Sequence, residues 1–157
     1  MHRYLVVANQ TLGGPELLAA ISDRMSRGPA EFHVLVPATS PTRLINDFNA
    51  LSCAFPVDPD LVPGAADVRT HDHSVAAATA RLHTELSRLR SIGATVDGIV
   101  GDPDPMTAID DAVAVRRFDE IILSTLPPGV SRWLAWDLPR RIRRRTDIPL
   151  TVVTSRG

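Results

Sequence analysis

Two short segments combine residue types that can bind metal ions, and the first is His71-Asp72-His73. Imidazole nitrogens and carboxylate oxygens are common metal ligands. Residues two apart on a helix do not face each other, however, so a single helix could not direct both imidazoles at one ion. Thr70 or Asp72 at a helix start explains the polar residues as well, because such residues cap helices. We therefore expect no metal site here.

The second segment is Gly101-Asp102-Pro103-Asp104-Pro105. Its two carboxylates could bind a divalent cation, since hard cations prefer oxygen ligands. Carboxylates directly before a helix also cap its free N–H groups and favour its dipole. We favour the cap, and we keep Gly101 as a candidate ligand contact.

The segment 9–14, Asn-Gln-Thr-Leu-Gly-Gly, could present backbone N–H groups to an anion before a helix. Its adjacent glycines do not have the Gly-x-Gly-x-x-Gly spacing of dinucleotide-binding folds. A turn between a strand and a helix, which also needs glycine, is the interpretation that we favour.

Several reaction classes are excluded by residue type. All 17 basic residues are arginine, so there is no lysine for a Schiff base or for a Walker A phosphate loop. Cys53 is the only cysteine, which excludes an intramolecular disulfide and a multi-cysteine zinc site. Ser131 lacks the second glycine of a nucleophile elbow. We therefore expect no enzymatic activity, with hydrolase or transferase chemistry as the alternative.

The charge distribution bears on possible partners. The formal net charge is −1, which gives no general attraction to nucleic acid or to an anionic membrane. Five arginines lie within 140–145 and could contact nucleic acid or an acidic partner. Arginines late in a helix also complement its dipole, and no aromatic residues alternate with these for base stacking. We interpret the cluster as a solvated helix face and do not expect a nucleic-acid partner.

Five short apolar runs predict buried strands at 4–8, 32–36, 94–100, 120–124 and 150–153. Helical periodicity separates them. One stripe follows Gly14-Pro15, a second runs from Val75 to Leu89 and ends before Gly93, a third follows Asp104-Pro105, and a fourth helix is expected at 137–146. Alternating strands and helices predict an α/β fold, a doubly wound five-stranded parallel sheet with helices on both faces.

Such sheets bind ligands beyond the carboxyl ends of their strands. The segments to consider are therefore 8–14, 36–39, 101–104 and 124–132. Trp133 and Trp136 either anchor the loop after the fourth strand or line a ligand pocket or a subunit contact.

The chain is expected to form one domain, 1–157, with an irregular insertion at about 39–70 that is either a lid or a flexible segment. The first residues lead directly into a strand and do not resemble a signal peptide. No apolar stretch is long enough to span a bilayer. We expect a cytoplasmic protein without a membrane partner.

Three motifs in this order resemble the universal stress protein family. The first strand ends in Val7-Ala8-Asn9, where the family usually has an aspartate in place of Asn9. Val100-Gly101-Asp102-Pro103 resembles the family's Gly-Asp/Glu-Pro, and 118–125 (Phe-Asp-Glu-Ile-Ile-Leu-Ser-Thr) is similar to its Asp-Leu-Ile-Val-Met-Gly-Ser strand. A helix and a last strand at 148–153 follow at the family's spacing. The resemblance implies a Rossmann-like fold of the universal stress protein type.

The chain departs from the family in its ATP motif. ATP-binding members carry Gly-x-x-Gly, nine residues, and then Gly-Ser or Gly-Thr. The matching positions here hold Ser124, Pro127, Asp137 and Leu138. Proline has no amide hydrogen, and a carboxylate repels phosphate at close range. We expect Asp137 to cap the last helix with its side chain, a contribution of about 0.5–2 kcal/mol, and so to fill the anion site itself.

Two functions follow from the resemblance. The first is a non-catalytic stress-protein-like regulatory or ligand-binding domain that does not bind ATP in the family's usual way. The second is an adenine nucleotide binder, for AMP, cyclic AMP or ATP, with a remodelled phosphate loop. The candidate ligand-binding residues are Ala8, Asn9, Val36, Gly101, Ser124, Thr125, Gly129, Ser131, Arg132 and Asp137. We also expect a homodimer through the apolar last strand, because pairing would cover an open sheet edge.

Overall fold

The computed structural model describes residues 1–9, 11–38, 63–127, 129, 131 and 137–156, with the backbone alone at 63–74. The strands are β1 (His2–Val7), β2 (Ala30–Pro37), β3 (Thr95–Gly101), β4 (Glu120–Thr125) and β5 (Leu150–Thr154). They form a parallel sheet in the order β3-β2-β1-β4-β5. Each predicted strand is confirmed to within about two residues at either end.

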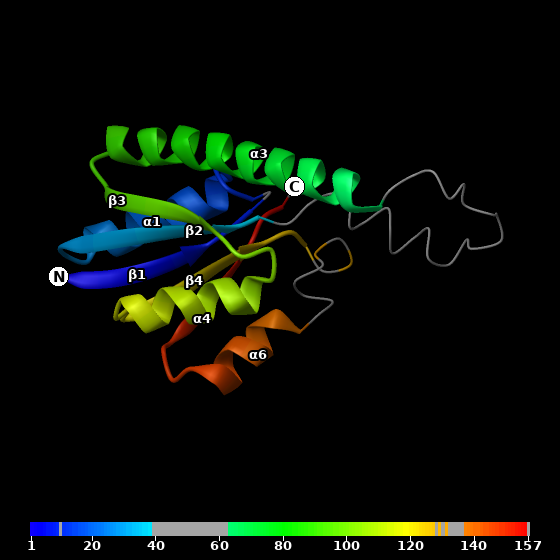
Figure 1. Cartoon of the computed structure of the whole chain (residues 1–157). Coiled ribbons are helices and arrows are strands. Elements are labelled where there is room, and N and C mark those ends of the chain that lie inside the picture. The colour runs from blue at the N-terminus through cyan, green and yellow to red at the C-terminus, as the bar shows by residue number, and fades with distance from the viewer. Residues whose placement is uncertain (10, 39–62, 128, 130, 132–136, 157) are drawn as a thin grey trace.

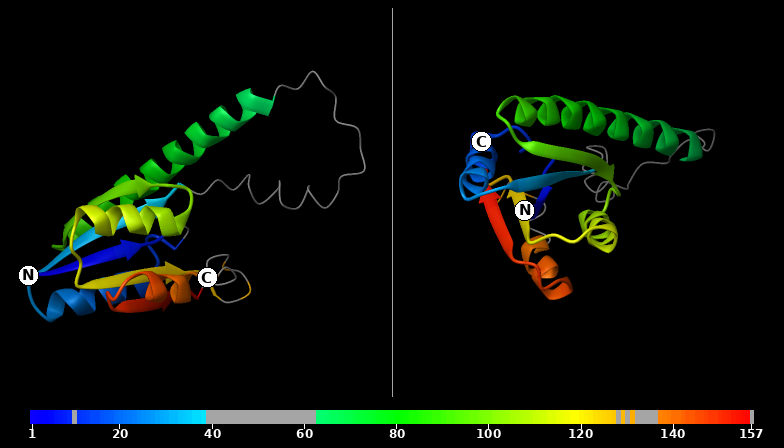
Figure 2. Two further views of the ribbon diagram at one scale, coloured as in Figure 1. Left: turned by 60° about the horizontal axis from the view of Figure 1, so that its bottom comes forward. Right: turned by 90° about the vertical axis from the view of Figure 1, so that its left-hand side faces the viewer.

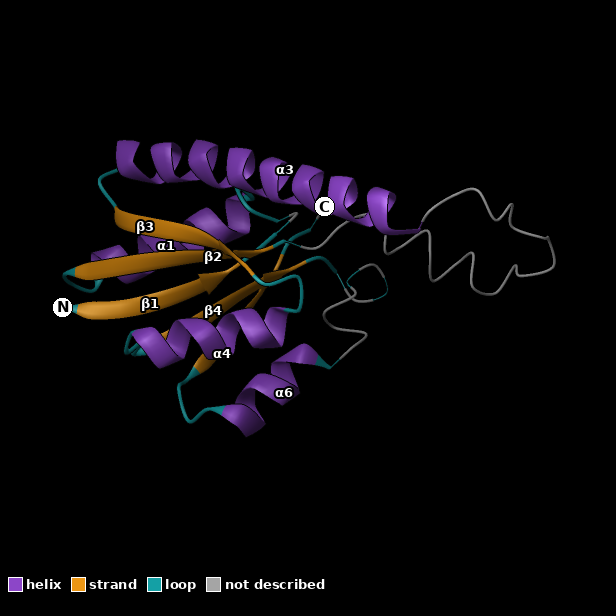
Figure 3. Ribbon diagram, viewed as in Figure 1, coloured by secondary structure: helices purple, strands orange, loops and turns teal. Residues whose placement is uncertain are grey.

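The helices of the described residues are α1 (Pro15–Ser26), α3 (Pro63–Ser91), α4 (Pro105–Val115) and α6 (Leu138–Arg145). They cover both faces of the sheet (Figures 1 and 3). The predicted doubly wound α/β fold is therefore confirmed. The order of strands reverses on either side of β1, because β2 follows on one side and β4 on the other. Ligands of such folds bind where strand order reverses, which here is the carboxyl end of β1 and β4.

The hydrophobic core has two halves because successive strand residues point to opposite faces. On one face, Tyr4 and Val6 of β1 pack with Leu17 and Ile21 of α1 and with the apolar stripe of α3. On the other face the core contains Leu5, Val7, Leu35, Met106, Ile109, Ile121, Leu123, Leu138 and Ile142. Hence α1 and α3 lie on one side, and α4 and α6 lie on the other (Figure 2).

Helix α3 is longer than the sequence predicted. It begins at Pro63, so 63–70 is helical and does not belong to an irregular segment. His71-Asp72-His73 consequently lies inside the helix, and neither Thr70 nor Asp72 occupies a helix start. Proline is well tolerated in a first helical turn, which explains why the helix can start at Pro63. The rest of the predicted insertion, 39–62, is outside the described residues, as is Cys53.

Local sequence signals set several helix ends. Helix α1 starts after Gly14 with Pro15 in its first turn, as predicted. Gly93, which follows α3, has a φ of 89°, a left-handed conformation that glycine adopts without strain. Asp104 caps α4 by accepting a hydrogen bond from the Thr107 N–H at 3.1 Å. The predicted cap at Asp104 is therefore confirmed.

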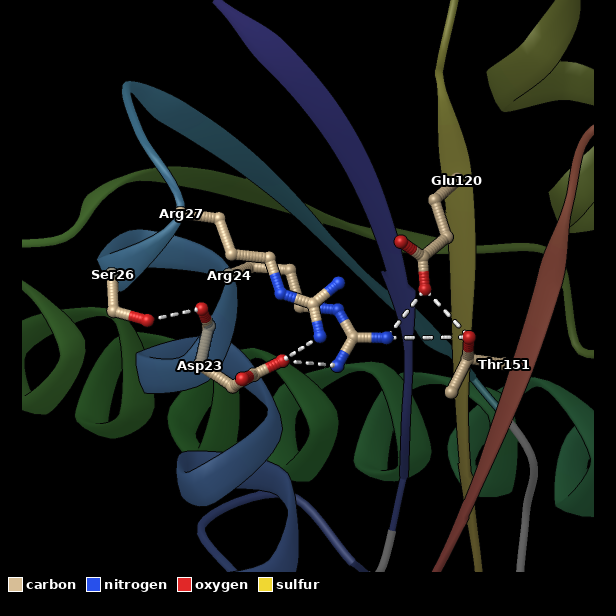
Figure 4. A network of polar contacts seen from close by, with 6 residues as sticks. All are labelled: Asp23, Arg24, Ser26, Arg27, Glu120 and Thr151. Atoms are coloured by element: carbon tan, nitrogen blue, oxygen red, sulfur yellow. Dashed lines mark hydrogen bonds and ion pairs between the residues drawn. The ribbon is translucent and has the colours of Figure 1, made fainter.

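A polar network ties α1 to the last two strands of the sheet (Figure 4). Arg24 donates to Glu120 at 2.6 Å and to Thr151 at 3.3 Å, and Thr151 donates to Glu120 at 2.6 Å. The Asp23 carboxylate forms an ion pair with the Arg24 guanidinium group at 3.2 Å and a second ion pair with Arg27 at 2.7 Å. Burial alone would raise the pKa of Glu120, but the hydrogen bonds from Arg24 and Thr151 outweigh it and lower that pKa.

None of the helices that the structure describes has the length and apolar character needed to cross a bilayer.

Candidate functional site at the carboxyl edge of the sheet

Two hydrogen bonds between Thr11 and Ser124 join the loop after β1 to the end of β4. Thr11 donates its hydroxyl to the Ser124 carbonyl at 3.0 Å, and the Ser124 hydroxyl donates to the Thr11 oxygen at 2.8 Å. Both side chains are buried. The hydroxyl of Ser124, which we expected to meet a ligand, is thus occupied within the protein.

Two arginines of α3 also donate hydrogen bonds to the loop after β1. Arg81 donates to the Asn9 side-chain oxygen at 3.0 Å, and Arg88 donates to the Gly13 carbonyl at 2.9 Å. Both contacts are exposed. Asn9 therefore does lie at the carboxyl edge, as predicted, and its side-chain oxygen is bonded to a neighbouring helix.

A buried carboxylate lies against this loop. Glu85 of α3 is only 4% exposed, and its Oε1 atom has no hydrogen-bond partner among the described residues. Its Oε2 atom is 2.9 Å from the place that a Cβ atom on Gly13 would occupy, and Gly13 has a φ of 89°. Only glycine satisfies both the space and the conformation there. Burial raises the pKa of Glu85, although the nearby Arg88 opposes the shift.

The end of β4 carries a buried hydroxyl group for which the described residues provide no hydrogen-bond partner. The carbonyl of Thr125 accepts a hydrogen bond from the Ser155 N–H at 2.8 Å. The Oγ1 atom of Thr125 is buried and has no partner within the described part of the chain. Since buried polar groups are normally hydrogen-bonded, this hydroxyl can bond to a ligand or a water molecule. Ser155 also approaches the β1–α1 loop, since its Oγ atom would be 3.7 Å from a Cβ atom on Gly14.

Other candidate residues serve the core. Ala8 and Val36 are fully buried among the side chains that α1 and α3 cover. An adenine ring could therefore not reach their side chains unless that part of the core opened. At Gly101 a Cβ atom would lie 2.8 Å from Leu35 and 2.9 Å from Ala108. Glycine is needed there so that β3 and α4 can approach each other.

The segment after β4 is described at only some of its residues. Gly129 is exposed and has a φ of 88°, a conformation that glycine adopts without strain. Ser131 is buried, and its N–H donates to the Pro127 carbonyl at 3.0 Å. Arg132, Trp133 and Trp136 lie outside the described residues.

The predicted side-chain cap at Asp137 is wrong. Asp137 does occupy the position before α6, but its carboxylate makes no capping hydrogen bond. The backbone is left-handed there, with a φ of 56°, and the side chain is 61% exposed, with Arg140 at 3.8 Å. A cap requires an extended backbone that directs the carboxylate toward the first N–H groups, and a left-handed residue does not provide it. The hypothesis that Asp137 fills an anion site therefore loses its geometric basis.

Sequence reasoning did not find Arg81, Glu85 or Arg88. A signal for Glu85 was present, because it lies three residues after Leu82 and four before Leu89, on the face that packs against the sheet. A charged residue in an apolar stripe indicates a buried polar group. The contacts of Arg81 and Arg88 depend on how α3 crosses the loop, which periodicity does not specify.

No family model matches this chain, and no curated protein is found to be similar to it. In the residues whose side chains are described, no three potential metal ligands gather at one place. The resemblance to universal stress proteins consequently stays an expectation drawn from three motifs.

Proposed function

We propose that this protein is a non-catalytic ligand-binding or regulatory domain of the universal stress protein type that does not bind ATP in the usual way of that family. The observation that carries the proposal is the Glu85 carboxylate, buried against Gly13 of the β1–α1 loop. A phosphate group at this loop would meet a negative charge at short range. In a partly buried site that repulsion costs several kcal/mol, on the order of the attraction between opposite charges there.

Two buried polar atoms at the carboxyl edge of the sheet indicate which kind of ligand this edge favours. Glu85 Oε1 and Thr125 Oγ1 are both buried and lack partners among the described residues. A carboxylate accepts hydrogen bonds, and a hydroxyl can accept as well as donate. We therefore propose a ligand that offers hydroxyl or amino donors in preference to phosphates.

The second candidate function is binding of an adenine nucleotide that carries fewer phosphates than ATP. Two observations favour it. Helix α6 begins without a side-chain cap, so its first N–H groups are not bonded to the Asp137 carboxylate. Gly129 also has the positive φ that lets a backbone approach a ligand closely. Because AMP and cyclic AMP carry less charge than ATP, they suit this second candidate better.

Calorimetric titration with AMP, cyclic AMP and ATP tests both candidates. For the wild-type protein we expect no saturable heat with ATP, and we expect Glu85→Gln to gain ATP binding because it removes the opposing charge. Asp111→Asn, which neutralises an exposed carboxylate on α4, is the matched control and should gain nothing. Tight ATP binding by the wild-type chain would contradict the first candidate. The absence of saturable heat with all three nucleotides would contradict the second.

We further propose a homodimer through β5. This strand lies at the edge of the sheet and pairs only with β4 among the described strands. Its other side carries backbone groups that a second copy could bond, since open edges tend to pair. Analytical ultracentrifugation at micromolar concentration should detect a dimer. A monomer over the whole concentration range would refute this part of the proposal.

A further inference from the structure

Helix α6 carries an exposed group of arginines on the opposite side of the sheet from α3 (Figures 1 and 2). We call this group the arginine face, and its members are Arg140, Arg141, Arg143, Arg144 and Arg145. The apolar residues of the helix, Leu138 and Ile142, are buried in the core with side chains of β4 and α4. The apolar side of α6 is thus covered by the fold, whereas all five arginines are exposed.

The positive charge of the arginine face is only partly balanced within the described residues. Arg140 lies 3.8 Å from Asp137, and Arg145 lies 3.2 Å from Asp110. The other three arginines form no ion pair or hydrogen bond with any residue that the structure describes. Guanidinium groups stay charged in proteins. Five positive charges against two paired carboxylates leave an excess of three.

The helix dipole accounts for only some of these charges. Cations are favourable in the last turn of a helix, where Arg143, Arg144 and Arg145 lie. Arg140 and Arg141 lie closer to the start of the helix, where a positive charge is unfavourable. Residues three and four apart are neighbours on a helix surface, and like charges at these spacings destabilise the helix. A partner with negative charges would relieve both costs.

The surroundings of α6 limit the size of such a partner. The eight residues of α6 span about 12 Å. Exposed carboxylates lie at both ends, Asp137 before the helix and Asp147 after it. A nucleic-acid duplex or an anionic membrane extends well beyond this length, so its phosphates would also meet these carboxylates. A helix on a membrane surface also directs an apolar side toward the lipid, whereas Leu138 and Ile142 are buried in the core.

A short acidic segment of a polypeptide fits these limits better. A carboxylate can form two parallel hydrogen bonds with a guanidinium group, which makes arginine well suited to pairing with glutamate and aspartate. In a second helix, glutamates three and four residues apart also lie on one side. Because both helices have the same rise per residue, their charged side chains recur at matching intervals.

We propose that the arginine face is a docking surface for an acidic helical segment of a partner protein. Arg140, Arg143 and Arg144 lie on the side of α6 away from Leu138 and Ile142, so they are the first candidates to pair with the partner's carboxylates. The docking surface is independent of the function proposed for the carboxyl edge, because it uses none of the residues of that site. Each can therefore fail without the other.

Fluorescence anisotropy of a labelled peptide tests the proposal. The probe is an alanine-rich peptide of about 20 residues, long enough to form a helix by itself, with glutamates three and four residues apart along one side. The full-length protein should bind it saturably. Binding should weaken as the ionic strength rises from about 0.01 M to about 0.1 M, because the Debye length falls from about 30 Å to about 10 Å.

Charge-matched variants locate the binding surface. The double variant Arg143→Gln/Arg144→Gln should bind the peptide about tenfold more weakly, the loss expected for two exposed ion pairs. Arg27→Gln/Arg117→Gln is the matched control, since it neutralises two exposed arginines outside α6 and gives the same net charge. We expect this control to bind like the wild type. Circular dichroism checks that each variant is folded, and unchanged affinity in the folded Arg143→Gln/Arg144→Gln variant would overturn the proposal.

Two comparisons test the class of partner. A peptide of the same composition with its glutamates distributed around the helix should bind more weakly, and equal binding would refute recognition of an acidic helix side. A DNA duplex or a phosphatidylserine vesicle should also bind more weakly at equal ionic strength. Tighter binding of either would refute an acidic protein partner. In ¹⁵N-labelled protein, peptide-induced amide shifts should occur in α6 and not at Glu85 or Thr125, which separates this surface from the carboxyl edge.

Discussion

Glu85 and Asp137 are two carboxylates whose contacts in the fold were not predicted from the sequence. Glu85, within a helix pattern, is buried against Gly13 and lacks a partner for Oε1 among the described residues. Asp137, at a helix start, is turned outward in a left-handed conformation. Both side chains therefore carry a cost in the folded state, one from lost hydration and one from backbone strain.

Glu85→Gln should stabilise the fold at neutral pH by about 1 kcal/mol, because it removes a negative charge that burial disfavours. Because burial raises the pKa of Glu85 above its ordinary value of 4.5, the folded state favours the protonated form. The contribution of Glu85 to stability is thus complete below about pH 4.5 and is lost as pH rises through the raised pKa. Urea unfolding at pH 7 and at pH 4 should show the gain at pH 7 alone. An equal gain at both values would contradict this explanation.

Asp137→Gly should raise the free energy of unfolding by about 0.5 kcal/mol, because glycine adopts a positive φ without the steric cost that side chains pay. The ion pair lost with Arg140 is exposed and contributes little. Asp137→Ala is the matched control, since it removes the same carboxylate but keeps the Cβ atom, and we expect it to be the least stable of the three. Thermal unfolding measures the order. A glycine variant no more stable than the alanine variant would refute backbone strain.

At the scale of elements, short-range signals set the starts of α1 and α4 and the end of α3. Proline in a first turn and glycine after a last turn act within a few residues, so the sequence predicts them directly. The start of α3 at Pro63 was not predicted, because 63–70 carries little apolar periodicity. A helix can extend beyond its packed stripe once tertiary contacts have stabilised the remainder.

Asp104→Ala should destabilise the protein by about 1 kcal/mol, which is the usual cost of losing an N-cap. Asp104 accepts hydrogen bonds from both the N–H and the hydroxyl of Thr107, at 3.1 and 2.8 Å. Asp104→Asn retains a capping oxygen and should recover most of the loss. Chemical unfolding of both variants distinguishes the two cases, and equal destabilisation would mean that the charge matters more than the hydrogen bond.

For the whole molecule, the two halves of the core and the order β3-β2-β1-β4-β5 bring distant segments together. The network of Arg24, Glu120 and Thr151 joins α1 to β4 and β5, which are about a hundred residues away along the chain (Figure 4). Asp97 joins β3 to β2 and to the residue after α4 in the same way. Both networks depend on an ionised carboxylate.

The stability of the whole fold should therefore fall in acid. The pKa values of Asp97 and Glu120 lie below their ordinary values of 3.8 and 4.5. Such groups contribute stability above those values and lose it as pH falls through the lowered pKa. Urea unfolding should show a decline below about pH 4.5, and Glu120→Gln should lose about 1–2 kcal/mol at pH 7 while showing a shallower decline. A decline of unchanged steepness in that variant would assign the acid sensitivity to other groups.

The sequence by itself determined the fold class, because apolar runs and helical stripes alternate along the chain and each element records its own burial in its periodicity. It also determined the edge position of β5 and the cap at Asp104, which follow from local pattern and element order. Only the tertiary structure placed Glu85 against Gly13, turned Asp137 outward and brought Asp97 together with His33 and Arg116. The physical reason is that the contacts of a charged group depend on which distant segment packs against it. Local periodicity places Glu85 on the buried face of α3, but it does not indicate that Gly13 lies against it.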